Sequence, residues 1–140
     1  MKDRNLPGSP WTYFFRRELV IKKNIRFPEN IFHEDEEFNT ILHYHAQTLI
    51  ESNATLYCYC TREGSTTANR SKDFEARRID NIFTIIKKIN AFKEENAASA
   101  NTIQRDAITR KLRTLTVDAI LNMMYDGRKA KEIYDTCLER

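Results

Sequence analysis

Glycine is scarce in this chain, and its scarcity limits the kinds of site that the sequence can build. Three glycines occur in 140 residues, whereas an average usage of about 7% would give about ten. Neither G-x-G-x-x-G nor G-x-x-x-x-G-K-[ST] occurs, so a self-contained glycine-rich phosphate-binding fold is not expected. No apolar run approaches the roughly 18 residues that span a bilayer. No signal peptide follows the N-terminus, and we expect an intracellular chain.

Cysteine is also sparse, and its spacing does not fit a metal site. The three cysteines are Cys58, Cys60 and Cys137, and an odd number without an export signal argues against a disulfide framework. Cys58-x-Cys60 is not a zinc spacing, and His43 and His45, two residues apart, point in different directions on a helix. We therefore expect no metal on these residues and interpret Cys58 and Cys60 as small apolar residues on one face of a strand.

The charge is mild and unevenly distributed. Residues 1–69 hold 8 Lys and Arg against 9 Asp and Glu, while residues 70–140 hold 15 against 11. The resulting charges of −1 and +4 are well short of a nucleic-acid-binding signature, so no nucleic-acid partner is expected. The composition also changes near residue 70, and we divide the chain into two regions there.

Hydrophobic periodicity predicts a mostly helical chain with one to three short strands. Ser9-Pro10 fits a helix start, and the aromatic run that follows fits equally a short strand leading into a helix. The strongest helix of the first region runs from about Asp35 to Glu51, and the aromatic segment 56–60 predicts a strand. The second region predicts helices over about 72–95, 102–125 and 128–139.

One string in the chain has the composition of a chemical site, namely His33-Glu34-Asp35-Glu36-Glu37. Adjacent carboxylates repel one another, which raises the pKa of some members, while a helix start opposes that rise. A carboxylate held there can act as a general base. Taken alone, the cluster is better explained as a solvated helix start that complements the helix dipole.

Three segments in order resemble the C-terminal part of the catalytic domain of family 2 glycosyltransferases, which have the GT-A fold. Residues 10–19 (PWTYFFRREL) resemble an aromatic strand leading into an Arg-Arg-Glu helix. Residues 25–29 (IRFPE) and 34–38 (EDEEF) resemble the segment that carries the family's catalytic base, an aspartate. Residues 57–65 (YCYCTREGS) resemble a strand with a closing turn. The resemblance covers about 58 residues, from Gly8 to Ser65.

This resemblance implies an α/β fold, the C-terminal part of a GT-A Rossmann-like domain for residues 1–69, followed by a helical region over 70–140. It implies transfer of a sugar from a nucleotide-sugar donor to a glycan or lipid-linked acceptor, with inversion. Asp35 corresponds to the base that takes the proton of the acceptor hydroxyl. Glu34 would orient that base or contact the acceptor.

The resemblance also implies three substrate-binding residues. Trp11 would lie near the acceptor, because aromatic faces stack on sugars; its alternative is a core tryptophan. Arg62 would balance the leaving diphosphate; its alternative is a turn residue paired with Glu63. His33 is assigned to the same binding region.

Other features of the family have no counterpart in the sequence. There is no D-x-D string and no βαβ pattern before Gly8, so the Mg²⁺ or Mn²⁺ that the family implies would have its ligands in an N-terminal half that is absent. We therefore expect the isolated chain to be inactive, and to be cytoplasmic or peripheral at the inner membrane face. The alternative is an inactive helical interaction module or remnant. Self-association through an exposed strand or helices is a further expectation.

Overall fold

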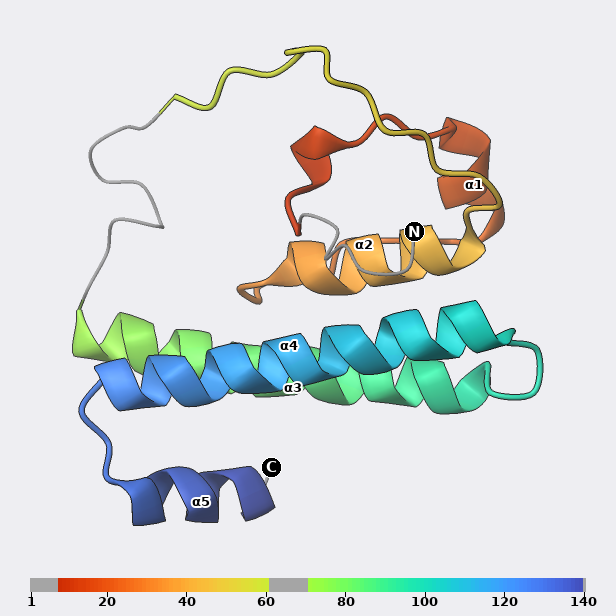
Figure 1. Cartoon of the computed structure of the whole chain (residues 1–140). Coiled ribbons are helices and arrows are strands. Elements are labelled where there is room, and N and C mark those ends of the chain that lie inside the picture. The colour runs from red at the N-terminus through yellow and green to blue at the C-terminus, as the bar shows by residue number, and fades with distance from the viewer. Residues whose placement is uncertain (1–7, 61–70, 140) are drawn as a thin grey trace. The chain divides into compact units, whose positions relative to one another are not determined.

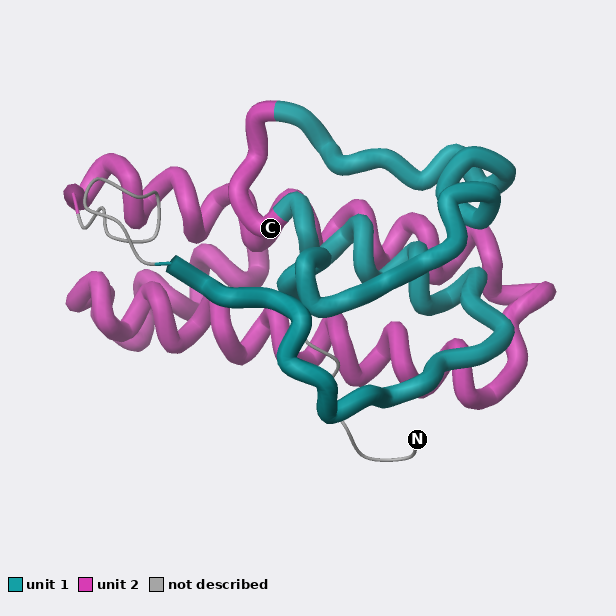
Figure 2. The backbone as a smooth tube through the Cα atoms, turned by 90° about the horizontal axis from the view of Figure 1, so that it is seen from above, with its two compact units in different colours: residues 1–29, 34–69 teal, residues 30–33, 70–140 magenta. Residues whose placement is uncertain are grey.

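The computed structural model describes residues 8–60 and 71–139. The chain divides into two compact units, each with its own core (Figure 2). Unit 1 comprises residues 1–29 and 34–69, and unit 2 comprises residues 30–33 and 70–140. The short segment 30–33 therefore belongs to the second unit, although its flanking residues belong to the first.

Unit 1 contains a short 3-10 helix, η1 (Pro10–Thr12), and two α-helices, α1 (Arg17–Lys22) and α2 (Glu34–His45) (Figure 1). Proline at the first position of η1 fits its fixed φ. The core of the unit consists of three buried residues with three partly buried neighbours: Ile25, Phe38, Leu42, Leu19, Val20 and Ile41. The Phe27 ring also stacks on Phe38, with centroids 3.9 Å apart. This core joins α2 to α1 and to the loop that follows α1.

Unit 2 is a pair of long antiparallel helices followed by a short one: α3 (Lys72–Glu95), α4 (Thr102–Tyr125) and α5 (Ala130–Glu139) (Figure 1). Asn101 and Gln104 cap α4 reciprocally, each side chain accepting from the other's backbone N–H at 2.9 Å. Gly127, at a φ of +80°, ends α4. The core between the helices contains Ile79, Ile82, Phe83, Ala119 and Met123, all buried.

Residues 30–33 lie against α3 as part of unit 2. The Phe32 N–H donates to Asn81 Oδ1 at 2.7 Å, and the Phe32 ring lies 4.8 Å from the Phe74 ring. The Arg77 guanidinium lies over the Phe32 ring, 5.2 Å from its centroid, and donates a hydrogen bond to the Asn30 carbonyl at 3.3 Å. Backbone, aromatic and cationic contacts therefore fix this segment on the helix.

The expected α/β fold is wrong for the part of the chain that the structure describes. Those residues form helices and segments without regular structure, and none of them is in a β-strand. Residues 56–60, predicted as a strand, have no regular structure and are all exposed. The aromatic run 11–15, the other candidate strand, is not a strand either: it begins in η1 and continues without regular structure. The physical reason is that a strand needs neighbouring strands for its hydrogen bonds, and the described segments provide none.

Helix bounds differ from the predicted ones mainly at the end of α2. The helix stops at His45 and not near Glu51, and Ala46 N–H closes the last turn on the Leu42 and His43 carbonyls. Ile50, which the periodicity assigns to the buried stripe, is 85% exposed. Among the described residues, no helix is both long and apolar enough to cross a membrane.

Candidate active site

The acidic string forms the first turn of α2. Glu34, Asp35, Glu36 and Glu37 all lie in that turn. The pKa of Asp35 is raised to about 6, mainly by burial and then by the neighbouring charges of Glu36 and Glu34, while hydrogen bonds from backbone N–H groups partly oppose the rise. Desolvation and repulsion therefore outweigh the helix dipole at this carboxyl.

The segment 8–13 lies alongside α2 within unit 1. Asn39, which is buried, donates from its side chain to the Gly8 carbonyl. A Cβ on Gly8 would lie 2.6 Å from Glu36 Oε1, so glycine permits the close approach at this point. Further along, the Tyr13 ring meets His43 edge-on at 4.7 Å. Burial raises the pKa of Tyr13 to about 12, so its hydroxyl stays protonated at neutral pH.

Trp11 lies on the surface of unit 1 with two tyrosines. Its ring centroid is 5.9 Å from that of Tyr57 and 6.0 Å from that of Tyr59, and both pairs are stacked. The exposed fractions of Trp11, Tyr57 and Tyr59 are 44%, 53% and 56%. A core position for Trp11 is therefore wrong. The aromatic trio (Trp11, Tyr57 and Tyr59) offers partly exposed ring faces to solvent.

Trp11 follows closely on Gly8, which lies beside the acidic turn. Trp11 is three residues from Gly8, and consecutive Cα atoms are about 3.8 Å apart, so its Cα lies within about 11 Å of that of Gly8. Gly8 in turn contacts the Glu36 carboxylate next to Asp35.

The other predicted site residues are placed differently. His33 belongs to the segment fixed on α3 and not to the unit of Asp35, and it precedes α2 with a φ of 65°. Glu34 opens α2 beside Asp35. Arg62 and its turn lie outside the described residues. The sequence interpretation missed Tyr57 and Tyr59 as surface residues; their spacing of two is the signal that could have found them.

The residues that the structure describes do not fit the divalent cation that the resemblance implies. No three His, Cys, Asp or Glu side chains among them converge in a way that could hold a metal ion. The acids of the α2 turn radiate around the helix instead of facing one point. No chemical step is therefore assigned to a metal on these residues.

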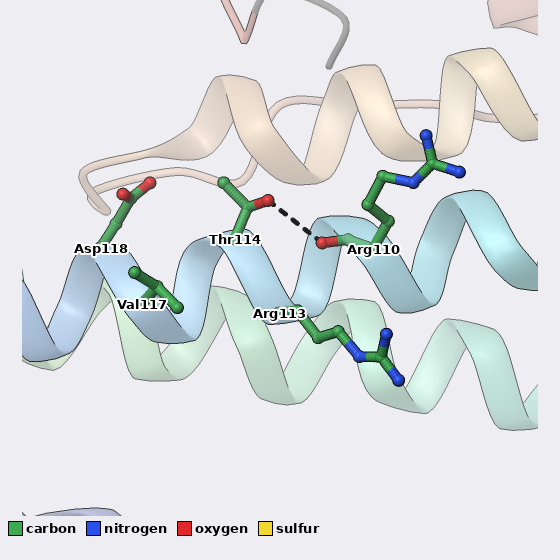
Figure 3. Close-up of a pocket in the computed structure, with 5 residues that line it drawn as sticks. All are labelled: Arg110, Arg113, Thr114, Val117 and Asp118. Carbon is green, nitrogen blue, oxygen red and sulfur yellow. Dashed lines mark hydrogen bonds between the residues drawn. The ribbon is translucent and has the colours of Figure 1, made fainter. Parts of the chain in front are cut away.

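A second feature lies on α4, in the other unit. A shallow hollow of about 250 Å³ is lined by five residues of this helix: Arg110, Arg113, Thr114, Val117 and Asp118 (Figure 3). It is a surface depression with mixed charge and carries no nucleophile or paired acid.

Comparison with known proteins gives no assignment: no protein-family model, no curated protein and no solved structure matches this chain.

Proposed function

We propose that unit 1 provides the acceptor side of an inverting, nucleotide-sugar-dependent glycosyltransferase, with Asp35 as the general base. The observation that carries the proposal is the Asp35 carboxyl, whose pKa is raised to about 6 in the first turn of α2. The ordered resemblance of residues 8–65 to family 2 glycosyltransferases supports the assignment of the reaction class.

The raised pKa suits a base that works near neutral pH. At pH 7 a carboxyl with a pKa of about 6 is mostly ionised, so it is ready to accept a proton. It is also more basic than an ordinary aspartate, and general-base efficiency increases as the pKa approaches the working pH. Burial, the main cause of the rise, also limits competition from water at the carboxylate.

The proposed step balances as a displacement. The acceptor hydroxyl oxygen bonds to the anomeric carbon as its proton passes to an Asp35 carboxylate oxygen. The bond between the anomeric carbon and the phosphate oxygen breaks, and the nucleoside diphosphate leaves with the electron pair. Attack from the face opposite the leaving group inverts the anomeric centre. Burial, and after it the charges of Glu36 and Glu34, keep the carboxylate basic.

The aromatic trio is the proposed acceptor platform. Sugar rings present apolar C–H faces that pack on aromatic rings, and partly exposed rings offer that surface without rearrangement. Trp11 is the only tryptophan of the chain, so its fluorescence reports on this site alone. We expect oligosaccharides that carry the acceptor group to change that fluorescence in a saturable manner.

The test is a titration of the full chain with a panel of oligosaccharides, in which binding is measured by the change in tryptophan fluorescence. The variants Tyr57→Ala and Tyr59→Ala should each weaken binding about five- to tenfold, since one packed aromatic pair contributes about 1 kcal/mol. Tyr134→Ala, at another exposed tyrosine (64%) on α5, is the matched control and should leave binding unchanged. Equal effects of all three variants would remove the trio from the proposed site.

The catalytic part is tested by sugar transfer in an enzyme that carries these residues with a donor-binding domain. Asp35→Asn should lower kcat by about 10²-fold or more while the KM for the donor stays nearly constant. Retained turnover would remove Asp35 from the base role and leave glycan binding by the trio as the function.

A further inference from the structure

Cys58 and Cys60 form a pair of accessible thiols two residues apart. Both are free and exposed, so they are not the small apolar strand residues that the sequence suggested. Residues 51–60 run without a turn, a bend or any regular structure, and Figure 1 shows them as one open trace. Small molecules in solution can therefore reach both sulfurs, whereas structural cysteines are usually buried and inert.

The two cysteines alternate with the tyrosines of the aromatic trio. In an extended segment, successive side chains project to opposite sides of the chain. Tyr57 and Tyr59 both stack on Trp11, with ring centroids 5.9 and 6.0 Å from that of the indole. One side of the segment is thus held by Trp11. Cys58 and Cys60 share the other side, where their sulfurs are the neighbouring groups.

The distance between the two cysteines allows a disulfide only if the chain shortens. The Cys60 thiol is already turned toward Cys58, since its Sγ donates to the Cys58 carbonyl oxygen at 4.0 Å. Cα atoms two residues apart in an extended segment are about 6.6 to 6.8 Å from each other. Most disulfides join Cα atoms about 5.5 to 6 Å apart. Closure therefore requires the backbone between the cysteines to contract by about 1 Å.

We propose that Cys58 and Cys60 are a redox-active dithiol that exchanges with low-molecular-weight disulfides, and that closure of their disulfide removes Tyr59 from its stack on Trp11. Tyr59 is the residue between the two cysteines, so its backbone is enclosed in the disulfide ring and leaves the extended conformation. Tyr57 lies outside that ring and keeps its stack. The exchange itself is independent of the glycosyltransferase assignment.

The exchange balances in two steps. The thiolate of one cysteine attacks a sulfur of the small disulfide, whose S–S bond breaks, and a mixed disulfide forms as one small thiolate leaves. The thiolate of the other cysteine then attacks the protein sulfur of the mixed disulfide and releases the second small thiolate. The two protons of the cysteines end on the two released thiols. The protein is oxidised by two electrons, and the small disulfide is reduced by two.

The second step is favoured by proximity, because the attacking thiol is two residues away in the same chain. The product is an exposed disulfide closed against the extended preference of the segment. Strained or exposed disulfides are readily reduced and are typical of labile or regulatory bonds. Excess small thiol should therefore reopen the bond, so that the pair follows the ratio of disulfide to thiol in its surroundings.

Mass spectrometry of the full chain after incubation with oxidised glutathione tests the exchange. The peptide that carries Cys58 and Cys60 should lose two hydrogen atoms and retain no glutathione. Cys137, the other exposed cysteine, is the matched internal control, and should carry glutathione because no second thiol lies near it along the chain. In Cys58→Ser, residue 60 should carry glutathione in the same way. Glutathione on both cysteines of the pair, or a pair that stays reduced while Cys137 reacts, overturns the proposal.

Tryptophan fluorescence tests the consequence for the aromatic trio. Trp11 is the only tryptophan, so its emission reports on the stack in the absence of any sugar. In a Cys137→Ser background, closure of the disulfide should change this emission, and excess reduced glutathione should reverse the change. Tyr59→Ala should lose most of the change because the ring that moves is gone, whereas Tyr57→Ala should keep it. An equal change in both variants, or a closed disulfide without any change, overturns the loss of stacking.

The effect on sugar binding rests on the proposed function, since Tyr59 belongs to the proposed acceptor platform. Closure should weaken oligosaccharide binding about five- to tenfold, as Tyr59→Ala does. If no oligosaccharide binds the reduced chain, the proposed function fails, while the mass and fluorescence measurements still decide the dithiol proposal. If the reduced and oxidised chains bind equally well although the emission changes, the dithiol does not control the platform.

Discussion

Replacement of Asp35 by asparagine should make the protein more stable while it removes the proposed base. The pKa of Asp35 in the folded chain is about 6, against an ordinary value of 3.8. Because the folded state binds this proton more tightly than the unfolded state, the stability that the protonated form contributes is complete below pH 3.8. It is lost as the pH rises from 3.8 through about 6. At pH 7 the ionised carboxylate therefore opposes folding.

The size of the effect follows from the pKa. One pKa unit corresponds to about 1.4 kcal/mol, so a rise from 3.8 to about 6 would cost at most about 3 kcal/mol. Asp35 is only partly buried, and solvent screens the charges that act on it, so we reduce the expected cost to about 1 to 1.5 kcal/mol. Asparagine has nearly the shape of the protonated acid and carries no charge. Asp35→Asn should therefore raise the free energy of unfolding by about that amount at pH 7.5.

Urea unfolding of both proteins at pH 7.5 and at pH 4 measures this difference. At pH 4 the wild-type carboxyl is protonated in the folded state, and the advantage of Asp35→Asn should nearly disappear. Asp73→Asn is the matched control, because Asp73 is the second residue of α3 as Asp35 is of α2, but is exposed. There, loss of the charge should cost about 0.3 to 1 kcal/mol through the helix dipole. An Asp35→Asn protein that is less stable than wild type at pH 7.5, or equally changed at both pH values, would refute the reasoning.

Two further predictions concern the helices of unit 2. Asn101→Ala should lower the free energy of unfolding by about 1 kcal/mol because it removes the reciprocal cap of α4. Ser71→Ala should cost less than half as much, since the Ser71 side chain makes no cap hydrogen bond at α3. Equal losses of stability for the two variants in urea unfolding would contradict this. Phe32→Ala should speed hydrogen exchange of the amide of residue 32 at least about tenfold, because the ring packing that holds this N–H on Asn81 is lost. Phe14→Ala, at a ring that is 86% exposed, should not affect the exchange of that amide.

The sequence predicted the helices of unit 2 because their signals are local. The apolar repeat of α3 and the position of Gly127 after α4 need only neighbouring residues to be read. The reciprocal cap at Asn101 is also encoded locally, although the sequence analysis did not identify it. The periodicity of residues 35–51 extended α2 too far, because Leu49 and Ile50 continue the apolar repeat without packing on the core as Leu42 does.

The candidate site could be predicted only in part. The position of Asp35 in the first turn of a helix followed from the acidic string, which favours a helix start. The direction of its pKa did not, because burial and the helix dipole act in opposite directions and only the folded structure shows which is larger. The docking of Phe32 on α3 could not be predicted from the sequence either. It joins residues 49 positions apart, and no local pattern specifies such a contact.

The segment 56–60 shows how one pattern can support a wrong structure and still indicate a real surface. Alternating tyrosines and cysteines predicted a strand, but strand formation depends on hydrogen-bond partners elsewhere in the chain, and none of the described residues pairs with this segment. The alternation has a second consequence that needs no partner strand. In an extended chain, residues two apart project to the same side, and Tyr57 and Tyr59 both stack on Trp11. The proposed acceptor platform therefore depends on the spacing of these rings and not on a β-sheet.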